Sequence, residues 1–74
     1  MARDLNQNEL VELEGMIDRA SLESVLHGLS EICGEKAEHI LSNWQDRATA
    51  KVWQTAEGVI GVASTHKAIM AVSR

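Results

Sequence analysis

The sequence predicts an all-α fold: an antiparallel helical hairpin with a short N-terminal helix, which completes a bundle by oligomerisation. The 74-residue chain contains no proline, and it is rich in residues that favour helices. Its apolar residues recur at spacings of three and four over most of its length. A chain this short buries only a modest core, so it gains most by pooling its apolar faces with a second copy.

The first predicted helix covers residues 7–19. Asn6 followed by Glu9 has the spacing of a capping box, in which each residue satisfies a backbone donor near the other. Leu10, Leu13 and Ile17 then form one apolar stripe at helical spacing. Ser21 is a good N-cap, so a second helix is expected to begin there.

The second predicted helix covers residues 21–44 and carries the longest apolar stripe. On a helical wheel the stripe occupies an arc of about 80°. Its members are Leu22, Leu26, Leu29, Cys33, Ala37, Ile40 and Trp44. A break at Gly34 is the alternative, because glycine often follows the last turn of a helix. The stripe passes Gly34 without losing phase, which favours one continuous helix.

A turn follows, and a third helix is predicted over residues 47–63. Asn43, Gln45 and Asp46 are weak helix formers or cap residues, and Asp46 can cap the third helix through Thr49. The expected contact face of this helix is a stripe of mostly small residues, which allow close helix approach. These are Ala48, Val52, Ala56, Val59 and Ala63. Residues 64–74 are predicted as helical or frayed, within a single domain 1–74.

Charge and composition bear on several functional classes. The net charge is −4, and the seven lysines and arginines are scattered, which argues against nucleic-acid binding. No run of eighteen apolar residues is present, so no membrane span is predicted. The polar N-terminus and the single cysteine lead us to expect a protein of the reducing cytoplasm.

We predict no catalytic, cofactor-binding or metal-binding residues. Cys33 lies in the centre of the apolar stripe, so it is interpreted as a small buried apolar residue. His27, Cys33 and His39 are six residues apart, and six residues rotate a helix by about 240°, so these side chains diverge. No nucleophile motif or phosphate-binding loop is found.

A candidate interaction surface lies between the second helix and the start of the third. It combines an acidic helix face with polar cap residues and two tryptophans, and the tryptophans are of a type that often anchors interfaces. Its members are Glu31, Glu35, Glu38, His39, Asn43, Trp44, Asp46 and Trp53. The alternative is purely structural: a solvated acidic face, capped helix ends, and tryptophans that cover the end of the hairpin.

The residues Glu35 to His39, Asn43 to Asp46, and Ala50 with Trp53 also carry a resemblance. The pattern EKAEH, NWQD and AxxW resembles that of short uncharacterised all-helical proteins of bacteria and their phages. The likeness covers residues 22–63. It implies a helical hairpin with its turn after Trp44, and it implies no activity, cofactor or partner.

These observations predict a small non-enzymatic protein–protein interaction, scaffold or regulatory module that is homo-oligomeric, with a dimer favoured. The alternative is a small phage or bacterial transcriptional regulator, in which IDRASLESVLHGL would form the turn between two DNA-binding helices. That second helix offers acidic groups where basic ones are expected. A metal- or redox-binding helical protein is the third hypothesis.

Overall fold

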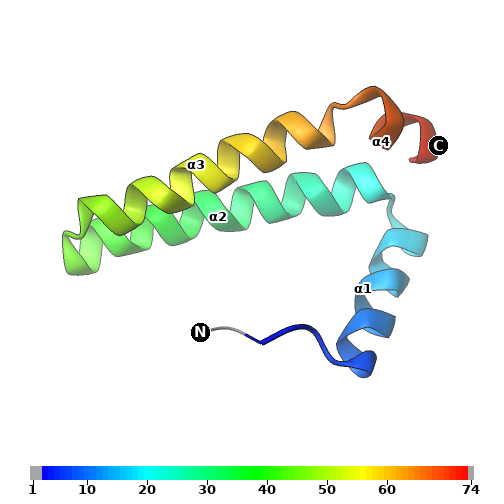
Figure 1. The fold of residues 1–74 in the computed structure, drawn as a ribbon, viewed down its shortest axis with the longest axis horizontal. Coiled ribbons are helices and arrows are strands. Elements are labelled where there is room, and N and C mark those ends of the chain that lie inside the picture. The colour runs from blue at the N-terminus through cyan, green and yellow to red at the C-terminus, as the bar shows by residue number, and fades with distance from the viewer. Residues whose placement is uncertain (1–2, 74) are drawn as a thin grey trace.

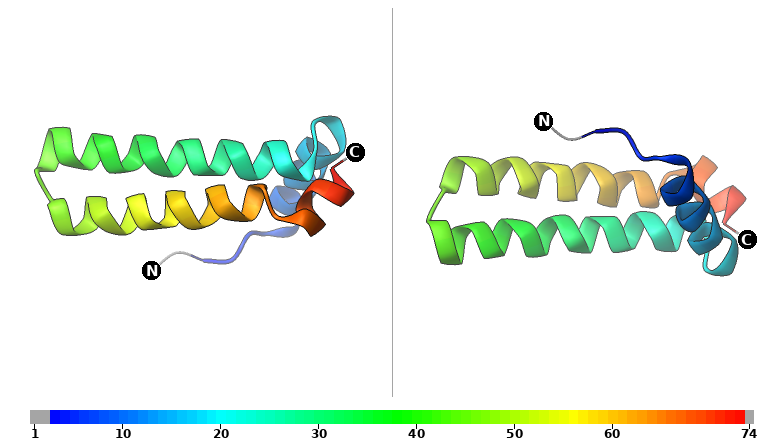
Figure 2. Two further views of the ribbon diagram at one scale, coloured as in Figure 1. Left: turned by 90° about the horizontal axis from the view of Figure 1, so that it is seen from above. Right: turned by 90° about the horizontal axis from the view of Figure 1, so that it is seen from below.

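The computed structural model describes residues 3–73, and within this range it contains four helices and no strand (Figure 1). The helices are α1 (Gln7–Arg19), α2 (Leu22–Trp44), α3 (Arg47–Ser64) and α4 (Lys67–Val72). The predicted all-α class is confirmed. α2 and α3 are the long helices, and they run side by side in opposite directions (Figures 1 and 2).

The helix bounds lie close to those expected from the sequence. α1 has the predicted range, while α2 begins one residue later and α3 ends one residue later than expected. α2 passes through Gly34 without a break. The segment 64–74 contains α4, and the predicted ranges also include Met1, Ala2 and Arg74, which lie outside the described residues.

A capping box begins α1, as the spacing of Asn6 and Glu9 predicts. The Asn6 side-chain oxygen accepts a hydrogen bond from the Glu9 backbone N–H at 2.9 Å, and the Glu9 carboxylate accepts one from the Asn6 N–H at 2.9 Å. The guanidinium of Arg3 donates to the same carboxylate at 2.6 and 3.0 Å. The hydrogen bond from Arg3 has the larger effect on the pKa of Glu9, and the bond from the Asn6 N–H adds to it. Both hold this pKa below its ordinary value.

Two residues connect α2 to α3. Gln45 has a left-handed backbone (φ 51°), and its N–H donates to the Leu41 carbonyl at 3.2 Å, which ends α2. Asp46 caps α3, because its carboxylate accepts from the Thr49 backbone N–H at 3.0 Å and from the Thr49 hydroxyl at 2.7 Å. So short a connection turns the chain back on itself and makes α2 and α3 antiparallel neighbours.

Small residues form the contact between α2 and α3. Cys33 and Ala37 of α2 are buried, and so are Ala50 and Ser64 of α3. Across this seam the Ser30 hydroxyl donates to the Glu57 carbonyl at 2.9 Å, which requires close approach of the two backbones. The buried Ser64 hydroxyl donates to the Gly61 carbonyl of its own helix at 2.7 Å, so its polar group is satisfied.

The prediction of the contact face of the third helix is wrong. Val52 and Val59, two members of the predicted small-residue stripe, are exposed, whereas Ala50 and Ser64 lie against α2. In α2 the stripe is only partly covered, because Trp44 is 73% exposed and Leu29 is 40% exposed. The physical reason is that the smallest side chains allow the closest helix approach. In α2 these are Cys33 and Ala37 of the stripe itself, whereas in α3 they are Ala50 and Ser64, which lie outside the predicted stripe.

α1 and α4 lie at the end of the α2–α3 pair that is far from the two-residue connection (Figure 1). Ser73, at the end of α4, accepts a hydrogen bond from the Glu23 N–H at 2.8 Å and donates to the Ile69 carbonyl at 2.6 Å, which ties α4 to the start of α2. α1 projects crosswise from this end, so most of its length does not lie along the pair.

The chain exposes a large surface for its mass. Its accessible surface is 6023 Å², whereas a compact monomer of 8.1 kDa exposes about 4,500 Å². Many of the exposed side chains are large and apolar. Those on α1 and α2 include Leu10, Val11, Met16, Leu29, Ile32 and Trp44. The fold therefore leaves considerable apolar surface in contact with water.

Candidate interaction surfaces

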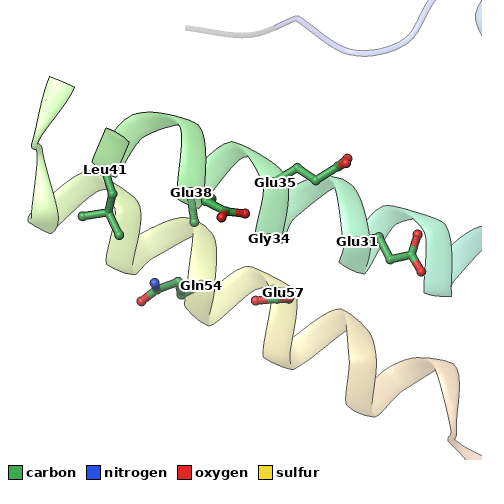
Figure 3. Close-up of a pocket in the computed structure, with 8 residues that line it drawn as sticks. Glu31, Gly34, Glu35, Glu38, Leu41, Gln54 and Glu57 are labelled. Carbon is green, nitrogen blue, oxygen red and sulfur yellow. The ribbon is translucent and has the colours of Figure 1, made fainter. Parts of the chain in front are cut away.

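The α2–α3 pair has two different sides. One side, here called the acidic flank, is a shallow groove of about 560 Å³ lined chiefly by acidic and amide side chains (Figure 3). Its polar residues are Glu31, Glu35 and Glu38 of α2 with Gln54 and Glu57 of α3. Glu38 and Glu57 lie toward the space between the helices, whereas Glu35 points away from α3. Three of the predicted surface residues thus lie together.

Glu57 and Gln54 belong to the acidic flank although the sequence analysis did not select them. The Glu57 carboxylate lies over Gly34, so close that a Cβ added to this glycine would be 2.5 Å from Oε2. Gly34 therefore makes room for an acidic side chain from the opposite helix. The sequence shows only that Glu57 is seven residues after Ala50, which places both on one side of the helix. The structure shows that this side faces α2.

The opposite side of the pair, here called the apolar flank, is lined by large side chains. A groove of about 400 Å³ lies between α2 and Trp53 of α3, and its α2 lining is Ile32, Glu35, Lys36, His39 and Ile40. Helical spacing extends the same side to Leu29, three residues before Ile32, and to Ile60, seven residues after Trp53. We define the apolar flank as Leu29, Ile32, Ile40, Trp53 and Ile60.

One cation lies within the apolar flank. The Lys36 ammonium is 5.7 Å from the centroid of the Trp53 ring, a cation–π contact. Within residues 3–73 the ion pairs are Arg3–Glu9 and His27–Glu31, so Lys36 has no carboxylate partner there. His39 lies one turn further along α2, and its Nδ1 is 3.0 Å from the side-chain nitrogen of Asn43.

The remaining predicted residues lie near the connection between α2 and α3. Asn43 also donates to the His39 carbonyl at 3.0 Å, Trp44 is largely exposed, and Asp46 caps α3. The backbone N–H of Thr49 and then its hydroxyl lower the pKa of Asp46 below its ordinary value. The eight predicted residues are therefore distributed over both flanks and the connection, and do not form one patch.

A third apolar groove runs along α1. Its volume is about 380 Å³, and Leu10, Leu13 and Ile17, the stripe expected from the sequence, line it with Val11. Glu14 is part of the same lining, because it follows Leu10 by four residues and precedes Ile17 by three. A carboxylate thus lies within the apolar face of α1.

Cys33 is 7% exposed at the α2–α3 seam, the buried position expected for it. Over residues 3–73, no three histidine, cysteine, aspartate or glutamate side chains are grouped so that they could hold a metal ion. In the same part of the chain, none of the helices has both the length and the apolar character needed to cross a membrane.

Comparison with known proteins finds no matching family model, no matching curated protein and no matching solved structure. The resemblance to short helical proteins of bacteria and phages therefore stays a prediction.

Proposed function

We propose that the chain is a non-enzymatic protein–protein interaction module of a scaffold or regulatory kind, which acts as a homodimer in the cytoplasm. In this proposal the α2–α3 pair is a helical hairpin that completes a bundle with a second copy. The observation that carries it is the excess surface: about 1,500 Å² beyond that of a compact monomer. A standard interface buries about 800 Å² on each partner, so the excess suffices for one.

The apolar flank is the proposed site of association. Leu29 and Ile32 are 40% and 48% exposed although both belong to a long helix with a buried side. Apolar area that is removed from water stabilises a complex by about 25 cal/mol per Å² before the cost of association. The acidic flank then stays outside the dimer, where its carboxylates are available to a different protein that carries basic groups.

Sedimentation analysis of the wild-type chain tests the proposal. We expect a species of twice 8.1 kDa at micromolar concentration. Ile32→Ser removes an apolar side chain from the flank and should weaken the dimer at least about tenfold, because each dimer loses two such side chains. Val62→Ser is the matched control, since Val62 is 74% exposed and lies outside the flank; it should leave the dimer unchanged. A well-folded wild-type monomer would refute the proposal.

A further inference from the structure

We propose that α1 of a second copy lies on the apolar flank, so that two chains exchange their N-terminal helices and Glu14 of each pairs with Lys36 of the other. This inference rests on the proposed homodimer and names the helix that covers its apolar flank. It follows from two apolar grooves of the same chain, one along α1 and one beside Trp53, which contain the oppositely charged side chains Glu14 and Lys36.

α1 has an apolar face that its own chain covers only in part, because Leu13 and Ile17 are half-buried. Leu10 is 46% exposed and Val11 is 57% exposed, and the helix projects away from the α2–α3 pair (Figure 1). Thirteen residues form a rod about 20 Å long. An amphipathic helix with anchors at Leu10, Leu13 and Ile17 is the kind of element that binds in an apolar groove of another protein.

The α1 groove carries the carboxylate of Glu14, and the groove of the apolar flank carries the ammonium of Lys36 together with the carboxylate of Glu35, which also lines the acidic flank. In the part of the chain that the structure describes, neither Glu14 nor Lys36 takes part in an ion pair. α1 also carries Glu9, Glu12, Glu14 and Asp18 against one arginine, so its net charge is negative. Docking of α1 on the flank would place a carboxylate beside Lys36 without burying either charge alone.

The length of the helices indicates that the partner is a second copy and not the same chain. Ala20 and Ser21 join α1 to α2. Glu14 is six residues before Ala20, about 9 Å along its helix, whereas Lys36 is fifteen residues after Ser21, about 22 Å along α2. If α1 folded back on its own α2, Glu14 would stop about 13 Å short of Lys36. Exchange between two chains removes this mismatch, because the partner's α1 is not joined to this α2 by the short linker and can bind further along it.

Charge reversal tests the exchange. Glu14→Lys and Lys36→Glu each place like charges together at both exchange sites, so each should weaken the dimer about tenfold at low salt. The double variant Glu14→Lys/Lys36→Glu restores opposite charges and should dimerise within about threefold of wild type. Glu12→Lys and Lys51→Glu are the matched controls: they make the same charge changes at exposed positions outside the two grooves, and should leave the dimer unchanged.

An equimolar mixture of the two single variants distinguishes exchange from folding back. In the mixed dimer both α1–flank contacts join opposite charges, so the mixture should associate as tightly as wild type although each variant alone does not. Sedimentation velocity measures all these species, and circular dichroism shows that each variant is folded. A mixture that associates no better than its components would overturn the exchange, as would a dimer insensitive to both reversals. In either case a wild-type dimer would leave the proposed function standing, whereas a wild-type monomer would refute both.

Discussion

The two flanks of the α2–α3 pair are built from the same two helices but differ in the side chains that line their grooves. On the acidic flank, Gly34 allows the Glu57 carboxylate to lie against the opposite helix. On the apolar flank, Ile32, Ile40 and Trp53 stand around a groove that nothing in residues 3–73 fills. Both flanks thus hold an open groove, and they differ in its lining: acidic and amide side chains on one side, and mostly large apolar side chains on the other.

This difference shows that side-chain size, more than hydrophobicity, decides which side of each helix faces the other. Ala37 and Ala50 are 2% and 1% exposed, while the larger Val52 and Val59 point to water. Close approach of the backbones yields dense packing and the hydrogen bond from Ser30 to Glu57. The larger apolar side chains are displaced to one flank, where a partner can cover them.

The largest expected effect concerns the seam between the flanks. Ala50→Leu places three more carbon atoms where the helices are closest, so it should lower the free energy of unfolding by about 1–3 kcal/mol. Ala48→Leu adds the same atoms at an exposed position of the same helix and should change it by less than about 0.5 kcal/mol. Chemical unfolding at one protein concentration measures both. Equal losses would mean that small size at Ala50 does not set the seam.

Much of the fold is predictable because it depends on local chemistry. Asn6 with Glu9 specifies the start of α1, and Asp46 with Thr49 specifies the start of α3. Continuity through Gly34 follows from the phase of the apolar stripe, since a glycine in a helix costs only about 1 kcal/mol. Each of these features involves residues within one or two turns of each other.

The choice of contact face was not predictable in the same way. A helical wheel ranks faces by hydrophobicity, and by that measure the stripe through Val52 and Val59 is the best face of α3. The face that packs contains Ala50, Glu57, Gly61 and Ser64, two of which are polar. Recognising this face of α3 requires knowledge of α2, where Ser30 and Gly34 leave room for its residues. For the same reason Glu57 was absent from the predicted surface.

Substitutions at two glycines of α2 should have a smaller effect on stability. Gly28→Ala adds a Cβ that meets no atom within 4 Å, so it should stabilise the helix by about 0.5–1 kcal/mol. Gly34→Ala gains the same helix propensity but must displace the Glu57 carboxylate, so its net effect should be smaller. Thermal unfolding of both variants measures the difference. Equal stabilisation would show that Glu57 moves aside at no cost and that its position over Gly34 contributes nothing to stability.

The smallest expected effect concerns the two-residue connection between α2 and α3. The carboxylate of Asp46 caps α3, and its pKa in the folded chain lies below its ordinary value of 3.8 because Thr49 donates to the charged form. A depressed folded pKa means that the unfolded chain takes up a proton first, so the contribution to stability is complete above the ordinary value. It is lost as the pH falls through the lower, folded pKa.

In Asp46→Asn the amide oxygen still accepts from the backbone but does not titrate, whereas the other carboxylates titrate in both proteins. The difference in Tm between wild type and this variant should therefore be constant from pH 7 to about pH 5 and should shrink below pH 4. A difference that stays the same down to pH 2.5 would mean that the charge on Asp46 contributes nothing to the cap, and that the side chain acts there only as a hydrogen-bond acceptor for Thr49.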